Sequence, residues 1–230
     1  MSVDAINKYL QTTVGREKAL RFIQYFARFY AFYLLRNGAP KEAIQRWGDL
    51  KTHIGNGRKF FRLLKQFEFA QAGVKALSIQ DEVLRVTGAL KQVGMFFYYT
   101  TEAVVLANAV NFYKVSKIKE VQKLGFKCWI TALTMSVITS LYKFRNLSIR
   151  AAQLEKTFKS EKSTEQVQAE AKSLVAEKKG LQKQLLQDLV DMIIPSAGLN
   201  LLPVDEGIVG LAGMTTSWLA MTSQWKKLNA

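Results

Sequence analysis

The sequence of 230 residues has few of the residue types from which disulfides, metal sites and active sites are built. It contains one cysteine, Cys128, and one histidine, His53. A single cysteine excludes an intrachain disulfide, and together with a single histidine it cannot supply the common zinc ligand sets. No cysteine, serine or acidic group can be assigned to His53 as a catalytic partner, and no phosphate loop of the Walker type occurs. We therefore expect no catalytic residue, no metal and no cofactor, and we do not expect an enzyme.

Proline and the signals of β structure are also scarce. There are 3 prolines, and no alternating apolar run accompanies an Asn-Gly or Asp-Gly turn. Apolar residues instead recur at intervals of three and four, which is typical of amphipathic helices. Hydrophobic residues make up 49% of the sequence, enough to form a core. The predicted fold class is all-α.

Acidic residues are too few to balance the basic ones, and the formal net charge is +15. Residues 1–80 carry 14 lysines and arginines against 5 acidic residues, and residues 81–150 carry 10 against 4, whereas the remainder balances at 9 against 9. The whole excess therefore lies in the first 150 residues. Such a surface attracts either anionic phospholipid or a nucleic-acid backbone, unless it is merely solvated.

The most informative stretch is 57–77, which Gly55 and Gly57 are expected to separate from the preceding helix. At roughly 100° per residue it forms a basic amphipathic helix. This pattern is typical of a helix that lies in the headgroup layer of a membrane; an ordinary helix packed on a core is the alternative. Phe61 and Phe69 fall outside the apolar stripe. Arg58, Arg62 and Lys65 line the polar side, opposite Phe60, Leu63, Leu64, Phe67, Ala70, Val74 and Leu77.

Amphipathic helices are also predicted over 15–36 and 41–54, so that 1–80 forms a basic amphipathic-helix module. Region 81–150 is a hydrophobic helical region and a possible membrane segment. The lysine-, glutamate- and serine-rich stretch 151–180 is predicted to be a charged connector, either a solvated helix or a flexible linker. Region 181–230 forms the C-terminal helices, with a break at Pro195.

Three apolar stretches are long enough to consider as membrane helices. Residues 93–110 contain a single charge, Glu102, and suit a buried helix or a membrane span equally. Residues 128–142 are too short for a hydrocarbon layer of roughly 30 Å and are expected in a core or interface. Residues 207–225 carry no charge and are the predicted membrane span. Small residues there favour helix packing and oligomerisation: Gly210, Ala212, Gly213, Thr216, Ser217 and Ala220.

Three blocks, at 15–29, 57–65 and 207–227, resemble the peroxisomal biogenesis factor eleven family in its fungal form. The resemblance implies a protein of the peroxisomal membrane that self-associates and elongates the membrane before fission and proliferation of the organelle. It also implies that the connector 151–180 is variable and that the helix matching 57–77 bends anionic lipid. Headgroup contacts would then come from Arg58, Lys59, Arg62 and Lys65, and the inserted wedge from Phe60, Leu63, Leu64 and Phe67.

The resemblance implies four partners: an anionic phospholipid membrane, a second copy of the chain, the fission machinery with its dynamin-related GTPase and membrane adaptor, and a peroxisomal membrane-protein import receptor. Two other functions are compatible with the sequence. A membrane pore for small metabolites would need a residue such as Glu102 inside an apolar helix. Nucleic-acid binding fits the charge, but no recognition module is visible, so we expect no nucleic-acid partner.

Overall fold

The computed structural model describes residues 2–160 and 165–229, and all of the regular secondary structure in these residues is helical. The predicted all-α fold class is therefore confirmed. The helices are α1 (Val3–Leu10), α2 (Thr13–Arg36), α3 (Lys41–Phe60), α4 (Gln66–Leu77), α5 (Glu82–Ala109), α6 (Ile118–Ser160), α7 (Glu165–Gly198) and α8 (Glu206–Asn229).

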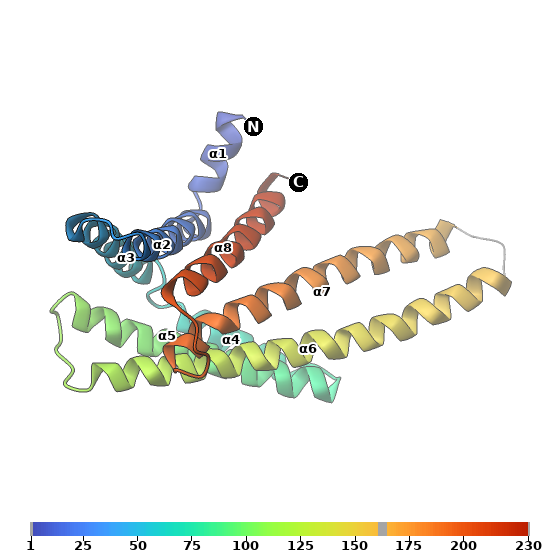
Figure 1. The fold of residues 1–230 in the computed structure, drawn as a ribbon. Coiled ribbons are helices and arrows are strands. Elements are labelled where there is room, and N and C mark those ends of the chain that lie inside the picture. Colours follow the sequence, from blue (N-terminus) through green and yellow to red (C-terminus); the bar gives the residue numbers. More distant parts are fainter. Residues whose placement is uncertain (1, 161–164, 230) are drawn as a thin grey trace.

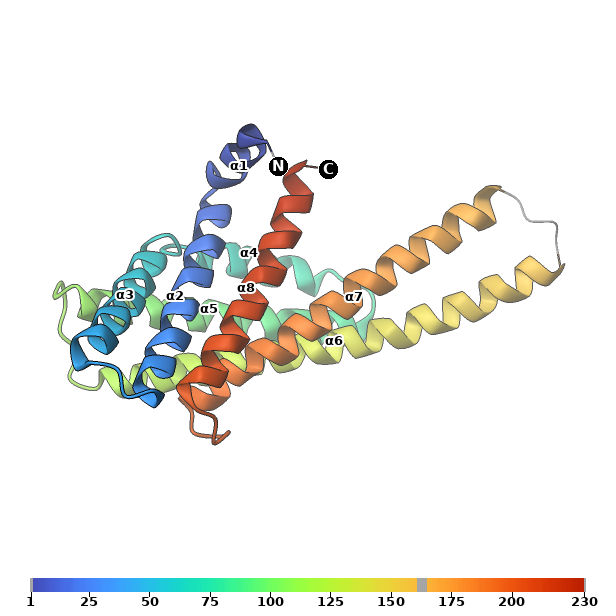
Figure 2. The ribbon, with the colours of Figure 1, turned by 45° about the horizontal axis from the view of Figure 1, so that its top comes forward.

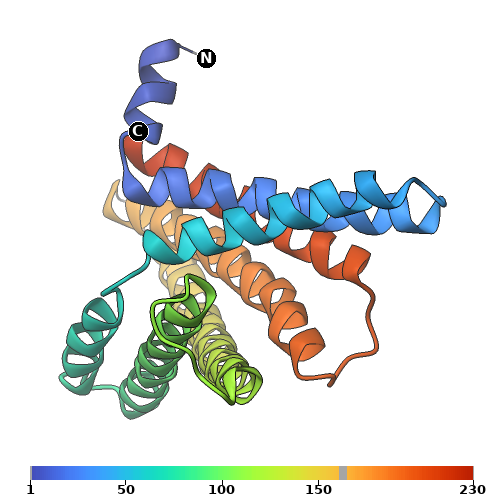
Figure 3. The same cartoon turned by 90° about the vertical axis from the view of Figure 1, so that its left-hand side faces the viewer.

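The helices are arranged in two crossing layers. α2, α3 and α8 form one layer, which crosses the layer made by α4, α5 and α6 (Figures 1 and 3). α7 joins the two because it packs against both α6 and α8. At this junction Tyr25, Ile194 and Val209 form a buried apolar cluster with Trp129 packed against it.

α6 and α7 run antiparallel, and their distal halves extend away from the layers as a long hairpin (Figure 2). The predicted connector, 151–180, belongs to this hairpin: its residues 151–160 and 165–180 continue α6 and α7 as helix, and the four between them lie outside the described residues.

Two predicted helix breaks are wrong. α3 continues through Gly55 and Gly57 to Phe60, and α7 continues through Pro195 to Gly198. At position 55 a Cβ atom would lie 2.8 Å from Nε2 of Gln24, so this glycine permits close packing of α3 on α2. A glycine in a helix interior costs only about 1 kcal/mol, so a glycine alone does not end a helix.

The hydrophobic stretches also differ from the prediction. Within the described residues α6 is the one helix that is long and apolar enough to cross a membrane, by length and composition alone. Residues 128–142 form only the middle of it, which is why their length was misleading. The predicted span, 207–225, lies in α8, where threonine and serine lower the hydropathy. A crossing by α8 therefore stays a prediction.

Candidate membrane-binding surface

The predicted amphipathic helix 57–77 is two helices joined by a turn. α3 ends at Phe60 and α4 begins at Gln66. Between them Leu64 has a φ of 65°, in the left-handed region that is unfavourable for a leucine. The prediction of one continuous helix is therefore wrong, because periodicity alone cannot reveal a change of direction in the backbone.

The turn and the helices that follow it expose many apolar side chains. Phe67 on α4 is 65% exposed, and Leu64 in the turn is 67% exposed. α5 continues the surface with residues spaced by three and four. We call this set the apolar face: Phe60, Phe61, Leu63, Leu64, Phe67, Val74, Leu77, Val83, Val86, Leu90, Val93 and Phe97.

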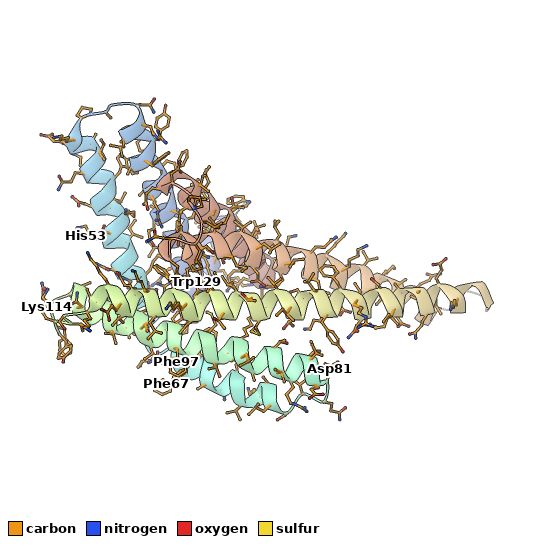
Figure 4. The ribbon with its side chains drawn as sticks, turned by 60° about the horizontal axis from the view of Figure 1, so that its bottom comes forward. His53, Phe67, Asp81, Phe97, Lys114 and Trp129 are labelled. Carbon is orange, nitrogen blue, oxygen red and sulfur yellow. The ribbon has the colours of Figure 1, made fainter. Side chains whose placement is uncertain are left out.

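A groove lies within the apolar face between α4 and α5. It has a volume of about 350 Å³, and almost its entire lining is apolar. α4 and α5 are in contact at Gly73, where a Cβ atom would make an ordinary van der Waals contact of 3.5 Å with Cβ of Gln92. Phe67 and Phe97 lie on this side of the molecule, away from α2 and α3 (Figure 4). Apolar surface on this scale marks an interaction site.

The two arginines of the same segment, Arg58 and Arg62, point the other way, into the protein. Arg58 is only 4% exposed, and its Nε donates a hydrogen bond of 3.0 Å to Oε1 of Glu17 on α2. Its guanidinium also donates to Oε1 of Gln24. The opposite charges hold the end of α3 against α2.

Arg62, in the turn, makes a second ion pair, which is partly buried. Its guanidinium lies 2.7 Å from a carboxylate oxygen of Glu102 on α5, and it packs over the ring of Tyr99. Tyr98 donates a further hydrogen bond to Glu102. The turn is thereby attached to α5 as well as to α2.

The electrostatics of this cluster centre on Glu17. Burial on its own would raise the pKa of this carboxyl group, but the charges of Lys18, Arg58 and Arg62 outweigh burial and hold the pKa well below its usual range. Glu17 is therefore an anion at any physiological pH, and it stabilises the buried arginines.

The predicted site residues consequently divide into two groups. The predicted wedge, Phe60, Leu63, Leu64 and Phe67, lies exposed on the apolar face. Of the predicted headgroup contacts, Lys59 and Lys65 are half-buried, with Lys65 over the Tyr99 ring. Arg58 and Arg62 face carboxylates inside the protein, so the guanidinium nitrogens that form these ion pairs are not presented to headgroups at the surface.

The small residues of α8 lie against α2 in the same chain. At Gly213 a Cβ atom would come within 2.2 Å of the Tyr25 ring, and at Gly210 within 2.8 Å of the Phe29 backbone. Ala212, Thr216 and Ser217 are buried, and Ala220 is half-buried. Their use in self-association stays a prediction.

Sequence reasoning missed two parts of the site. The α5 residues Val83, Val86, Leu90, Val93 and Phe97 carried a usable signal, since their spacing by three and four defines one face of a helix. The buried ion pairs carried none, because Glu17 and Glu102 are far in sequence from Arg58 and Arg62.

Over residues 2–160 and 165–229, the fold and the surface define a class: a helical protein with an extensive exposed apolar face and one helix that is apolar enough for a membrane. A family model described as peroxisomal biogenesis factor 11 (PEX11) matches residues 3–225. The chain belongs to this family. No solved structure matches it.

Individual relatives match over nearly their whole length. Peroxisomal biogenesis factor 11 of Schizosaccharomyces pombe is 26% identical, covering 95% of this chain and 92% of the relative. Peroxisomal membrane protein PMP27 of Saccharomyces cerevisiae is 28% identical, covering 98% and 95%. Peroxisomal membrane protein 11A of Mus musculus is 25% identical, covering 94% and 93%.

Proposed function

We propose that this chain is a peroxisomal membrane protein that takes part in peroxisome biogenesis by remodelling the organelle membrane. It does so by inserting its apolar face into one leaflet of an anionic membrane. Peroxisomal location and a role in biogenesis rest on the family and on the names of its relatives. Insertion rests on one observation: the phenylalanines and leucines around the turn between α3 and α4 are exposed together.

The arrangement of the turn suits a wedge. Apolar residues that enter a leaflet to a depth of about 5–10 Å expand it relative to the other leaflet, which bends the membrane. Arg58 and Arg62 attach the turn to α2 and α5, so the force on the inserted residues is carried by the folded body. A free helix would instead move with the lipid.

The positive charge of the protein brings the apolar face to an anionic membrane. The excess of lysine and arginine in residues 1–150 attracts anionic headgroups, at about 1 kcal/mol for each basic residue near the surface. Self-association would concentrate the wedges and convert local bending into a tubule. In this proposal membrane elongation precedes scission by the dynamin-related fission machinery.

The test is tubulation of anionic vesicles by the full-length protein, followed by electron microscopy. A variant with Phe60, Leu63, Leu64 and Phe67 all replaced by serine should bind fewer vesicles and produce no tubules. The control replaces Val175 and Leu186 by serine. These residues are similarly exposed but lie on α7, so this variant should still form tubules. Tubulation by the four-serine variant at the level of the wild type would refute the wedge.

A second function, passage of small metabolites, is favoured by a polar cavity of about 550 Å³ with Glu102 in its wall. A conducting path needs polar groups of this kind inside a membrane protein. Single-channel recording of the purified protein tests it: Glu102→Gln should change ion selectivity if the cavity conducts. Absence of any channel current from the wild-type protein would remove this candidate.

A further inference from the structure

The cavity beside the buried ion pairs has a composition that vesicle bending does not explain. α2, α3, α5, α6 and α7 all contribute to its wall, and its volume of about 550 Å³ is in the usual range for small-molecule sites. Eight lysine and arginine side chains line it, but only four carboxylates do. It is reachable from outside, since the side chain of Lys51 in its wall is 35% exposed.

The carboxylates in the wall are already engaged. Asp191 lies 2.6 Å from Arg21, and Glu206 accepts two hydrogen bonds from Arg28. Oε1 of Glu102 is paired with Arg62, while Oε2 of Glu102 is buried and has no hydrogen-bond partner in the described chain. Asp188 accepts from Ser136 and Gln184. Adding Glu17, which lies among Lys18, Arg58 and Arg62, brings the carboxylates to five, still three short of the eight cations.

Three donors in the wall have no anionic acceptor. The ammonium group of Lys59 donates to the side-chain oxygen of Asn56 at 3.2 Å, and that of Lys91 to the hydroxyl of Ser136 at 2.8 Å. Nε of Arg62 is buried and has no hydrogen-bond partner in the described chain. An unpaired buried donor is costly, and a ligand with acceptor oxygens removes that cost.

Burial also disfavours the charged state of Lys59 and Lys18. It lowers the pKa of Lys59 even though Glu102 acts in the opposite direction. Burial likewise lowers the pKa of Lys18 to about 8 in spite of its contact with Glu17. Both shifts indicate that the positive charges lack full compensation.

We propose that this cavity is a binding site for a phosphate monoester, either on a soluble molecule or on a lipid headgroup. A phosphate monoester carries a charge close to −2 and several strong acceptor oxygens. It therefore compensates more of the surplus than a single carboxylate could, and arginine and lysine are the side chains that bind phosphate. Lys59, Lys91 and Nε of Arg62 are the donors assigned to it. The inference is independent of membrane bending and of conduction.

Titration calorimetry of the full chain in neutral detergent, with glycerol 3-phosphate as the probe, tests the site for a soluble ligand. Sodium chloride at the same ionic strength is the blank. Lys59→Met together with Lys91→Met should weaken binding at least tenfold, whereas Lys119→Met, at an exposed position, should leave it unchanged. Lys59→Met alone keeps the hydrogen bond between Lys91 and Ser136, and serves if the double variant does not fold.

The lipid source is tested in nanodiscs of phosphatidylcholine with and without phosphatidic acid. Thermal unfolding should shift upward with phosphatidic acid in the wild type, and the shift should disappear in the lysine variant. Binding of glycerol 3-phosphate would identify a soluble phosphate monoester as the ligand. A shift with phosphatidic acid would identify a lipid headgroup. Equal behaviour of wild type and lysine variant toward both probes, or no binding of either by the wild type, would overturn the proposal.

Discussion

Arg58 on α3 and Glu17 on α2 form a buried ion pair, with Nε and Oε1 3.0 Å apart. The sequence predicts that Arg58 contacts lipid headgroups, and it indicates no role for Glu17. Their pairing makes the basic side of the amphipathic segment an anchor to the protein, while the apolar side stays free for a membrane.

Arg58→Ala should lower the free energy of unfolding by about 3 kcal/mol, because it leaves a buried carboxylate with one partner fewer. Chemical denaturation in detergent measures this. Arg46→Ala, whose side chain is 81% exposed, is the control and should change stability by less than about 0.5 kcal/mol. Equal, small effects of both substitutions would mean that the ion pair does not hold α3.

The stability of the protein should depend on the ionisation of Glu17. Its pKa is lowered in the folded state, so its contribution is complete above the unfolded value of about 4.5 and is lost as the pH falls below that. Wild type should therefore exceed Glu17→Gln in melting temperature at neutral pH, and the difference should shrink on acidification. Glu42→Gln, at an exposed site, should show no such convergence. A difference that is constant with pH would contradict the assignment.

Gly213→Ala should destabilise the protein by about 1–3 kcal/mol, because the new methyl group would overlap the Tyr25 ring. Gly57→Ala is the matched control within a helix: a Cβ atom there meets nothing within 4 Å, so the substitution should stabilise α3 by about 0.5–1 kcal/mol. Thermal melts of both variants measure the contrast. If Gly213→Ala melts with the wild type but no longer self-associates, the small residues of α8 serve the oligomer instead.

Leu64→Gly should make the protein more stable than Leu64→Ala by about 1 kcal/mol. The reason is the φ of 65°, which glycine adopts without the steric penalty of a Cβ atom. Both substitutions remove the same exposed side chain, so unfolding measurements on the pair isolate the backbone effect. The reverse order would show that the turn does not hold this conformation in solution.

The sequence was sufficient to predict the helical class and the extent of α2, because the spacing of apolar residues by three and four is a local property of the sequence. It could not predict the turn at 61–65, since Leu64 carries no sign of a left-handed backbone. Nor could it predict the end of α3, because the packing of Gln24 on Gly55 is a tertiary contact between α2 and α3. For the candidate site, the apolar half of 57–67 was identified, but the partners of Arg58 and Arg62 depend on tertiary contacts.

The central claim is that the turn between α3 and α4 enters the lipid. It is tested most directly with an environment-sensitive fluorophore on Phe67→Cys, in a background with Cys128→Ser, compared with the same label on Val175→Cys. On adding anionic vesicles, the label at 67 should shift its emission to the blue and become quenched by lipid-borne quenchers, whereas the label at 175 should not respond. Emission at 67 that is the same with and without vesicles, while the protein is bound to them, would contradict the account.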